Sequence, residues 1–231
     1  MKRTIVPNIK MVKKVLSCKG KSGHWCPLFK KQGSLDGACA TYSVIMNLLV
    51  IRAINGSDTH WNAEHKSYAT KKLFKIFCED HGMHRGGQTF YKIKKMLLQS
   101  FESEVFVEHK VTEDVASIEL ISKVVKDGLP VVMSITGHAM LAIGIEEDGG
   151  KVTKILCLDP SGDYVTGRRR WNAEIDIANG SRGLYTYSSI IEGRPTCEKT
   201  RLDDVLIIPN RSGANDVWRH GVSVSPTRQT A

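Results

Sequence analysis

Three side chains that lie far apart in the sequence have the types that a nucleophilic hydrolase needs: Cys39, His138 and Asp159. A cysteine thiolate attacks carbonyl carbon, an imidazole can accept and return a proton, and a carboxylate can orient the imidazole. Cys39 stands at the start of a dense apolar segment, His138 at the start of a β-rich run, and Asp159 at the end of the next run. These residue types predict amide-bond chemistry through a thioester.

The segment that follows Cys39 is expected to be a buried helix. Residues 39–54 are apolar around nearly the whole helical circumference, Asn55-Gly56 is expected to end the helix, and Asp36 is expected to cap it. A helix N-terminus carries about half a positive charge and several unpaired N–H groups. Such a position favours ionisation of the Cys39 thiol and can stabilise the oxyanion that forms when a carbonyl is attacked.

A β-hairpin is expected to bring His138 and Asp159 together. Asp148-Gly149 is a favoured two-residue turn. A turn there places His138 directly opposite Asp159 on the same face of the sheet, with Cβ atoms ~5 Å apart. A turn at Gly149-Gly150 would break this pairing, so the prediction depends on the turn.

Gln32 lies shortly before Cys39, where its side-chain amide could donate a second hydrogen bond to the oxyanion. The alternative interpretation of Gln32 is a polar surface residue. Cys39 likewise has a second interpretation as a small core residue, which is the usual fate of a free cysteine.

Together these residues resemble the papain-like cysteine peptidases, and within them the C39-type peptidases. The resemblance covers residues 32–162 and implies that Cys39 is the nucleophile, His138 the general base, Asp159 the residue that orients His138, and Gln32 an oxyanion-hole residue. One departure is that the family usually places the Gln one residue closer to the Cys, and another is that Ala40 follows the Cys where Gly or Trp is common. The motifs that carry the resemblance are Gln32-Gly33, Gly37-Ala38-Cys39, Gly137-His138, Leu158-Asp159-Pro160 and Gly162.

The remaining pattern predicts a helical first half and a β-rich second half. The expected fold is α+β and papain-like, with a helical lobe (about 32–128) that carries the Cys helix and packs on an antiparallel β-rich lobe (about 129–209). Residues 1–31 are expected to form an irregular N-terminal arm and residues 210–231 a flexible tail. Helical patterns cover 65–81, 89–99 with Thr89 as the cap, and 112–128, and strand patterns cover 105–109, 129–135, 138–145, 152–159, 183–187 and 205–208.

Composition and charge exclude several classes of protein. The 231 residues are 41% hydrophobic and 25% charged, which is ordinary globular composition. Six cysteines are too few for a disulfide scaffold, no apolar run is long enough to span a membrane, and the N-terminus is a poor secretory signal. We therefore expect a cytoplasmic protein, or an effector that is secreted without a cleavable signal peptide.

The net charge of +9 favours an anionic partner. Basic residues are scattered and do not alternate with aromatic ones, so a nucleic-acid groove is not favoured and an acidic protein or peptide substrate is. No metal or organic cofactor is expected, because the metal-ligand residue types fit no zinc signature in their spacing. These residues are Cys18, His24, Cys26, Cys78, His81 and His84.

The sequence therefore predicts a cysteine peptidase that hydrolyses a peptide or isopeptide bond, as a bacterial or phage effector acting on a host protein. Two alternatives stay open. The same triad could serve an acyltransferase or a deamidase, or the chain could be a catalytically inert, basic binding module.

Overall fold

The computed structural model describes residues 1–33, 37–60, 66–79, 88–102, 104–111, 114–165 and 169–211. The helices in these ranges are α1 (Cys39–Val50), the 3-10 helix η1 (Gly56–Thr59), α2 (Tyr68–Glu79), α3 (Phe90–Phe101) and α4 (Asp114–Lys126). The strands are β1 (Lys2–Ile5), β2 (Ile9–Val12), β3 (Val15–Lys19), β4 (Trp25–Pro27), β5 (Glu108–Val111), β6 (Val131–Ile135), β7 (His138–Asp148), β8 (Lys151–Leu158), β9 (Ala173–Ser181), β10 (Leu184–Ile191), β11 (Arg194–Thr200) and β12 (Leu202–Ile207).

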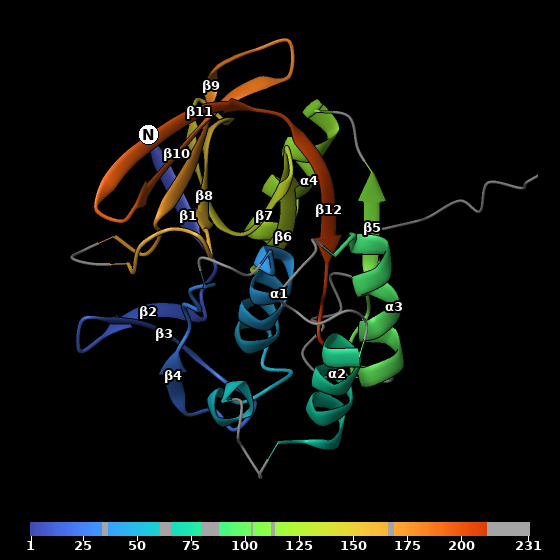
Figure 1. Ribbon diagram of the computed structural model, residues 1–231. Helices are drawn as coiled ribbons and strands as arrows, with labels where there is room; N and C mark the ends of the chain where they lie inside the picture. The colour runs from blue at the N-terminus through green and yellow to red at the C-terminus, as the bar shows by residue number, and fades with distance from the viewer. Residues whose placement is uncertain are drawn as a thin grey trace, which may run out of the picture.

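Within the described residues, nine strands form one large antiparallel sheet (Figure 1). Its order is β11-β10-β9-β8-β7-β6-β12-β5, and β1 pairs with the C-terminal half of β7. The strands β2, β3 and β4 form a separate small sheet. A large antiparallel sheet combined with separate helices is the α+β class that the sequence predicts. The division into two lobes stays a prediction.

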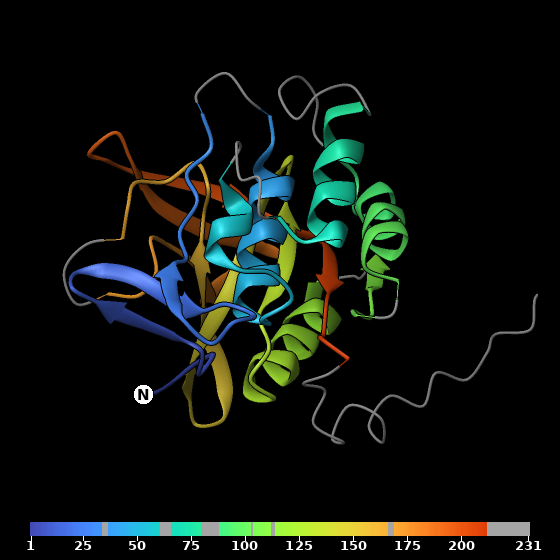
Figure 2. The ribbon, with the colours of Figure 1, turned by 90° about the horizontal axis from the view of Figure 1, so that it is seen from below.

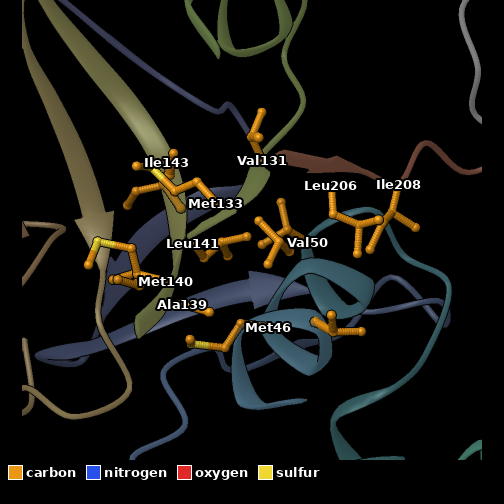
Figure 3. Packing of buried hydrophobic residues seen from close by; sticks show 14 of the residues in the cluster. Met46, Val50, Val131, Met133, Ala139, Met140, Leu141, Ile143, Leu206 and Ile208 are labelled. Carbon is orange, nitrogen blue, oxygen red and sulfur yellow. The ribbon is translucent and has the colours of Figure 1, made fainter. Parts of the chain in front are cut away.

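The helix α1 packs against the central strands β6 and β7, which explains why it is apolar on nearly every side. Met46 and Val50 of α1 lie beside Ala139 and Leu141 of β7, and all four are buried (Figure 3). Full burial of a side chain as large as Val, Leu or Met contributes ~1.5–3 kcal/mol to folding. The small sheet lies on one side of α1, and α2 and α3 lie on the other (Figure 1 and Figure 2). This packing fixes α1, and with it Cys39 at its first turn.

The end of α1 differs from the prediction. The helix stops at Val50 because Arg52 adopts a left-handed conformation with a φ of 59°. The Arg52 N–H donates to the Leu49 carbonyl, and the Ala53 N–H donates to the Leu48 carbonyl. These two bonds form a Schellman motif, a helix ending that usually contains glycine. Asn55, expected to end α1, instead caps η1.

The prediction that residues 1–31 form an irregular arm is wrong. They contain β1, which joins the large sheet, and the small sheet of β2, β3 and β4. The turn between β2 and β3 consists of Lys13 and Lys14, with φ values of 48° and 67°. Such a turn normally contains Asn or Gly, so two lysines gave no turn signal.

Other elements agree with the predicted pattern. Helices α2 and α4 lie within their predicted ranges, and α3 begins as predicted but extends two residues past 99 to Phe101. The Thr89 side chain caps α3 by accepting a hydrogen bond from the Lys92 N–H at 3.4 Å. The strands β9 and β11 were not predicted, and β11 is mostly exposed and lacks an apolar alternation. Asp36 and residues 212–231 of the expected tail lie outside the described residues. No described helix has the length and apolar character needed to cross a bilayer.

Candidate active site

The hairpin between β7 and β8 turns one residue later than predicted. Gly149 and Gly150 form the turn with φ values of 55° and 83°, and Asp148 pairs with Lys151. Glycine enters this left-handed region without steric cost, whereas a turn at Asp148-Gly149 would put Asp148 there. The prediction that His138 lies directly opposite Asp159 is therefore wrong.

The later turn nevertheless keeps His138 and Asp159 on one face. Leu141 pairs with Leu158, and the two register shifts within the hairpin cancel. Continuing this register places Asp159 opposite Met140, so Asp159 is a diagonal neighbour of His138. Diagonal neighbours on one face lie ~7–8 Å apart, which an imidazole can bridge. His138 Nε2 lies 2.6 Å from Asp159 Oδ1.

Asp159 is fully buried, and hydrogen bonds satisfy its carboxylate. Besides His138, the Ser161 N–H donates to Oδ1 at 2.8 Å, and the Tyr187 hydroxyl donates to Oδ2. Burial alone raises the pKa of this carboxyl group. The hydrogen bonds from His138, Tyr187 and Ser161 lower the pKa by more than burial raises it, so the net pKa is below its usual range. Asp159 is therefore a carboxylate that faces the imidazole.

Cys39 is the first residue of α1 and is half-buried. The Ala139 N–H, from the residue after His138, donates to Cys39 Sγ at 3.4 Å. The His138 imidazole is also close enough to the thiol for each group to shift the pKa of the other. Because Nε2 of His138 faces Asp159, Nδ1 is the ring nitrogen left for the sulfur. The structure thus brings Cys39, His138 and Asp159 into one continuous chain of contacts.

The pKa shifts follow from this chain of contacts. Burial raises the pKa of the Cys39 thiol, but His138 and the N–H groups of Ala139 and Ala40 lower it by more, so the net pKa is below 9.0. Burial lowers the pKa of His138, but the Asp159 carboxylate and the Cys39 sulfur raise it to about 10. Both directions favour a thiolate facing an imidazolium at neutral pH.

The start of α1 leaves N–H groups available near the sulfur. Its N-cap residue is Ala38, which makes no side-chain capping bond. The first backbone bond of the helix runs from the Tyr42 N–H to the Ala38 carbonyl. The amides of Cys39, Ala40 and Thr41 thus precede the intrahelical ladder, and such amides can stabilise a thiolate or an oxyanion.

Gln32 lies beside the other end of the triad. Its backbone N–H donates to the Pro160 carbonyl at 3.0 Å, and its Nε2 donates to Ser161 Oγ at 2.8 Å. Ser161 in turn donates its N–H to Asp159, so Gln32 and the triad share one hydrogen-bonded loop. The side-chain nitrogen of Gln32 carries two N–H groups, so one remains to donate a second hydrogen bond. An oxyanion-hole role for Gln32 stays a prediction.

Two residues of this site, Tyr187 and Asn172, are not predicted by the sequence analysis. Tyr187 on β10 reaches Asp159 from a strand that is far away in the sequence. Asn172 accepts a hydrogen bond from the Asp159 N–H at 2.8 Å and donates to the Asp159 carbonyl at 2.9 Å. Neither stands in a chemical motif, so only the sheet order reveals them.

A cavity adjoins the imidazole. It has a volume of about 280 Å³, and its lining includes His138, Ser161 and Tyr187 together with Glu198 and Lys199 of β11. The His138 side chain is 22% exposed, whereas Asp159 is not exposed. A ligand can therefore approach the imidazole while the carboxylate stays shielded from water.

The described residues contain no cluster of three or more His, Cys, Asp or Glu side chains that could hold a metal ion. His81 and His84, which have metal-ligand side chains, lie outside the described residues.

Comparisons with known proteins find likeness at the level of structure. No protein-family model matches the chain, and no curated protein matches it. A solved structure titled "Crystal structure of UfSP from C.elegans" is similar to this chain with a TM-score of 0.45 and 12% sequence identity, over 90% of this chain and 34% of that one. The chain spans about a third of the length of that structure.

Proposed function

We propose that the chain is a cysteine peptidase that hydrolyses a peptide or isopeptide bond. The observation that carries the proposal is the chain of contacts from Cys39 through His138 to the buried carboxylate of Asp159. Nucleophile, base and orienting acid in mutual contact are the geometric requirement for covalent acyl transfer. The proposal includes the papain-like fold, in which a helical lobe carries the Cys helix and a β-rich lobe carries His138 and Asp159.

In the acylation step, the Cys39 thiolate attacks the carbonyl carbon of the scissile amide. A C–S bond forms, and the carbonyl electron pair moves to oxygen. The backbone N–H of Cys39 and the second N–H of Gln32 Nε2 are the proposed donors to this oxyanion. His138 then gives its proton to the amide nitrogen, the C–N bond breaks, and the amine leaves behind a thioester on Cys39.

In the deacylation step, His138 accepts a proton from water while the water oxygen attacks the thioester. The C–S bond breaks, and the acid product leaves. Cys39 is again a thiolate and His138 again carries a proton, so the cycle closes without a cofactor. Asp159 keeps the imidazole oriented and stabilises its charge throughout.

The proposal also covers the substrate. The net charge of +9 would steer an acidic protein toward the chain. A bacterial or phage effector that acts on a host protein would fit this steering.

The first test measures alkylation rates at single cysteines. Native protein is treated with iodoacetamide at pH 7, and mass spectrometry of peptides gives the rate at each cysteine. Exposed Cys197 is an internal reference in the same chain. We expect Cys39 to react faster than Cys197, and His138→Ala to slow Cys39 about tenfold or more, since each unit of pKa changes the thiolate fraction tenfold.

A matched control separates the triad from the general effect of losing a histidine. His109 also contacts a carboxylate, with Nε2 3.2 Å from Asp204 Oδ2, but on β5. His109→Ala should leave the Cys39 rate unchanged. Equal Cys39 rates in wild type and His138→Ala would contradict the proposal and favour the inert binding module.

The second test identifies the reaction. A cell lysate is incubated in heavy-oxygen water with wild type or Cys39→Ala, and new protein N-termini are compared. Hydrolysis of a peptide bond gives a new N-terminus, and hydrolysis of an isopeptide bond gives a free lysine ε-amine. In both cases heavy oxygen enters the released carboxyl group, only with wild type. Joining of an amine to the acyl group, or conversion of Gln to Glu without cleavage, would instead identify an acyltransferase or a deamidase.

A further inference from the structure

A pair of thiols lies outside the candidate active site, on the small sheet. Cys18 of β3 and Cys26 of β4 are directly opposite each other in the antiparallel ladder. Opposite residues in such a ladder have Cα atoms ~4.5–5.5 Å apart, which is within the ~4.4–6.8 Å that a disulfide spans. Both cysteines are free thiols here, and Cys26 Sγ lies 3.5 Å from the Cys18 carbonyl oxygen. The ladder pairing therefore meets the backbone spacing that a disulfide requires.

The two thiols have unequal surroundings. Cys18 is fully buried, whereas Cys26 is partly exposed. Cys26 interacts with the Cys18 thiol, with the backbone N–H groups of Gly56 and Gly20, and with the charge of Lys30. Its hydrogen bond with Cys18 lowers the pKa of Cys26 and raises that of Cys18. Cys26 is therefore the thiol that ionises and is accessible.

The approach of Gly56 to Cys26 is unusually close. A Cβ at position 56 would lie 2.4 Å from the Cys26 Cβ and 3.0 Å from its sulfur, so only glycine fits there. The absence of a side chain lets the Gly56 backbone approach the sulfur closely, and its N–H lowers the pKa of Cys26. A partly exposed cysteine with amide donors, a nearby cation and a second cysteine beside it is the arrangement of a redox-active thiol pair.

We propose that Cys18 and Cys26 form a reversible disulfide, with Cys26 as the attacking thiol and Cys18 as the resolving thiol. The oxidant is a small disulfide such as glutathione disulfide. The Cys26 thiolate attacks one of its sulfurs, the S–S bond breaks, and one glutathione thiolate leaves. Cys18 then loses its proton to solvent and attacks Cys26 Sγ, and the second glutathione thiolate leaves. The pair loses two electrons, and the glutathione disulfide gains them.

The test uses the full chain with Cys39→Ser, so that the active-site thiol cannot react and the result does not depend on the proposed function. Native protein is equilibrated with mixtures of reduced glutathione and glutathione disulfide, and exchange is stopped with acid. The chain is then unfolded, its free thiols are alkylated with N-ethylmaleimide, and it is digested with trypsin. Cleavage after Lys14, Lys19, Lys21 and Lys30 puts Cys18 in peptide 15–19 and Cys26 in peptide 22–30. We expect these two peptides to become disulfide-linked as the glutathione disulfide fraction rises, and to separate again in dithiothreitol.

Three variants complete the experiment. In Cys18→Ser, Cys26 should retain one glutathione as a stable mixed disulfide, because nothing resolves it. In Cys26→Ser, Cys18 should stay reduced because it is buried. Cys197→Ser should still form the link, and thermal unfolding by circular dichroism shows that each variant is folded. Full alkylation of both peptides at every glutathione ratio, or a stable mixed disulfide on Cys26 while Cys18 is present, would overturn the proposal.

Discussion

Cys39 begins a helix whose start is poorly suited to stability. Ala38 occupies the N-cap position, where Ser, Thr, Asp or Asn would satisfy an amide. The loss of such a cap costs about 1 kcal/mol. In return, the first-turn amides and the Ala139 N–H remain near the sulfur. The local sequence thus favours a negative charge at position 39 over helix stability.

The pH dependence of Cys39 alkylation tests this electrostatic account. In wild type, the midpoint of the rise in rate should lie below pH 9.0, because the net pKa of Cys39 is lowered from that value. In wild type, the interaction with His138 offsets the effect of burial, which raises the pKa of Cys39. His138→Ala removes this interaction, so the pKa of Cys39 should increase and the alkylation rate should rise at a higher pH. The measurement is the second-order rate constant for iodoacetamide between pH 5 and 11, resolved by peptide.

Cys197 in the same samples reports any general effect of pH on the reagent or on folding, and its profile should be the same in both proteins. Superimposable Cys39 profiles in wild type and His138→Ala would mean that the imidazole does not stabilise the thiolate.

At the scale of elements, the sequence predicts those parts of the fold whose signals are local. The 3.6-residue periodicity placed α2, α3 and α4, and Thr89 marked the start of α3. The prediction failed where backbone geometry departed from residue preference. Arg52 ends α1 and Lys13-Lys14 forms a turn, both at left-handed φ angles that usually indicate glycine or asparagine.

The candidate site shows the same division. The types and order of Cys39, His138 and Asp159 are readable in the sequence. The predicted hairpin register was wrong by two residues, but His138 and Asp159 still lie on one face of the sheet because side chains alternate between the two faces. Tyr187 and Asn172 could not be predicted, because their approach to Asp159 depends on the order of β8, β9 and β10 in the sheet.

Arg52 gives a stability prediction for the end of α1. An L-residue in the left-handed conformation costs roughly 1–2 kcal/mol, while glycine costs more entropy on folding. Because the Arg52 side chain is exposed, Arg52→Gly should stabilise the protein by about 1 kcal/mol. Urea unfolding should show a higher midpoint with an unchanged m-value.

Two further variants at this position separate conformation from charge. Arg52→Asn also removes the charge but tolerates the left-handed region, so it should be close to wild type or more stable. Arg52→Val removes the same charge and should be less stable than either. Equal midpoints for the Gly and Val variants would show that backbone conformation is not the cause.

At the scale of the molecule, β7 connects the candidate site to the N-terminal strand. His138 is its first residue, and β1 pairs with residues 144–147 near its other end. Glu146 and Glu147 are buried there. Arg3 of β1 pairs with Glu146 and lies 4.7 Å above the Trp171 ring, and Lys126 Nζ lies 2.6 Å from Glu147 Oε1. Cations from β1 and α4 therefore neutralise two carboxylates of the central strand.

This arrangement predicts that β1 supports the stability of the sheet without acting on the triad. Arg3→Met leaves the Glu146 carboxylate buried without its cation, and because Arg3 is half-exposed we expect a loss of about 2 kcal/mol, below the range for fully buried pairs. Adding Glu146→Gln removes the stranded charge, so the double variant should be more stable than the sum of the single effects implies. The Cys39 alkylation rate should stay at the wild-type value in all three variants, because the pairing of β6 with residues 138–142 holds His138 independently of β1. Two outcomes would contradict this separation between the two ends of β7. One is that the stability losses measured by urea unfolding are additive in the double-mutant cycle. The other is that Cys39 is alkylated more slowly in Arg3→Met than in wild type.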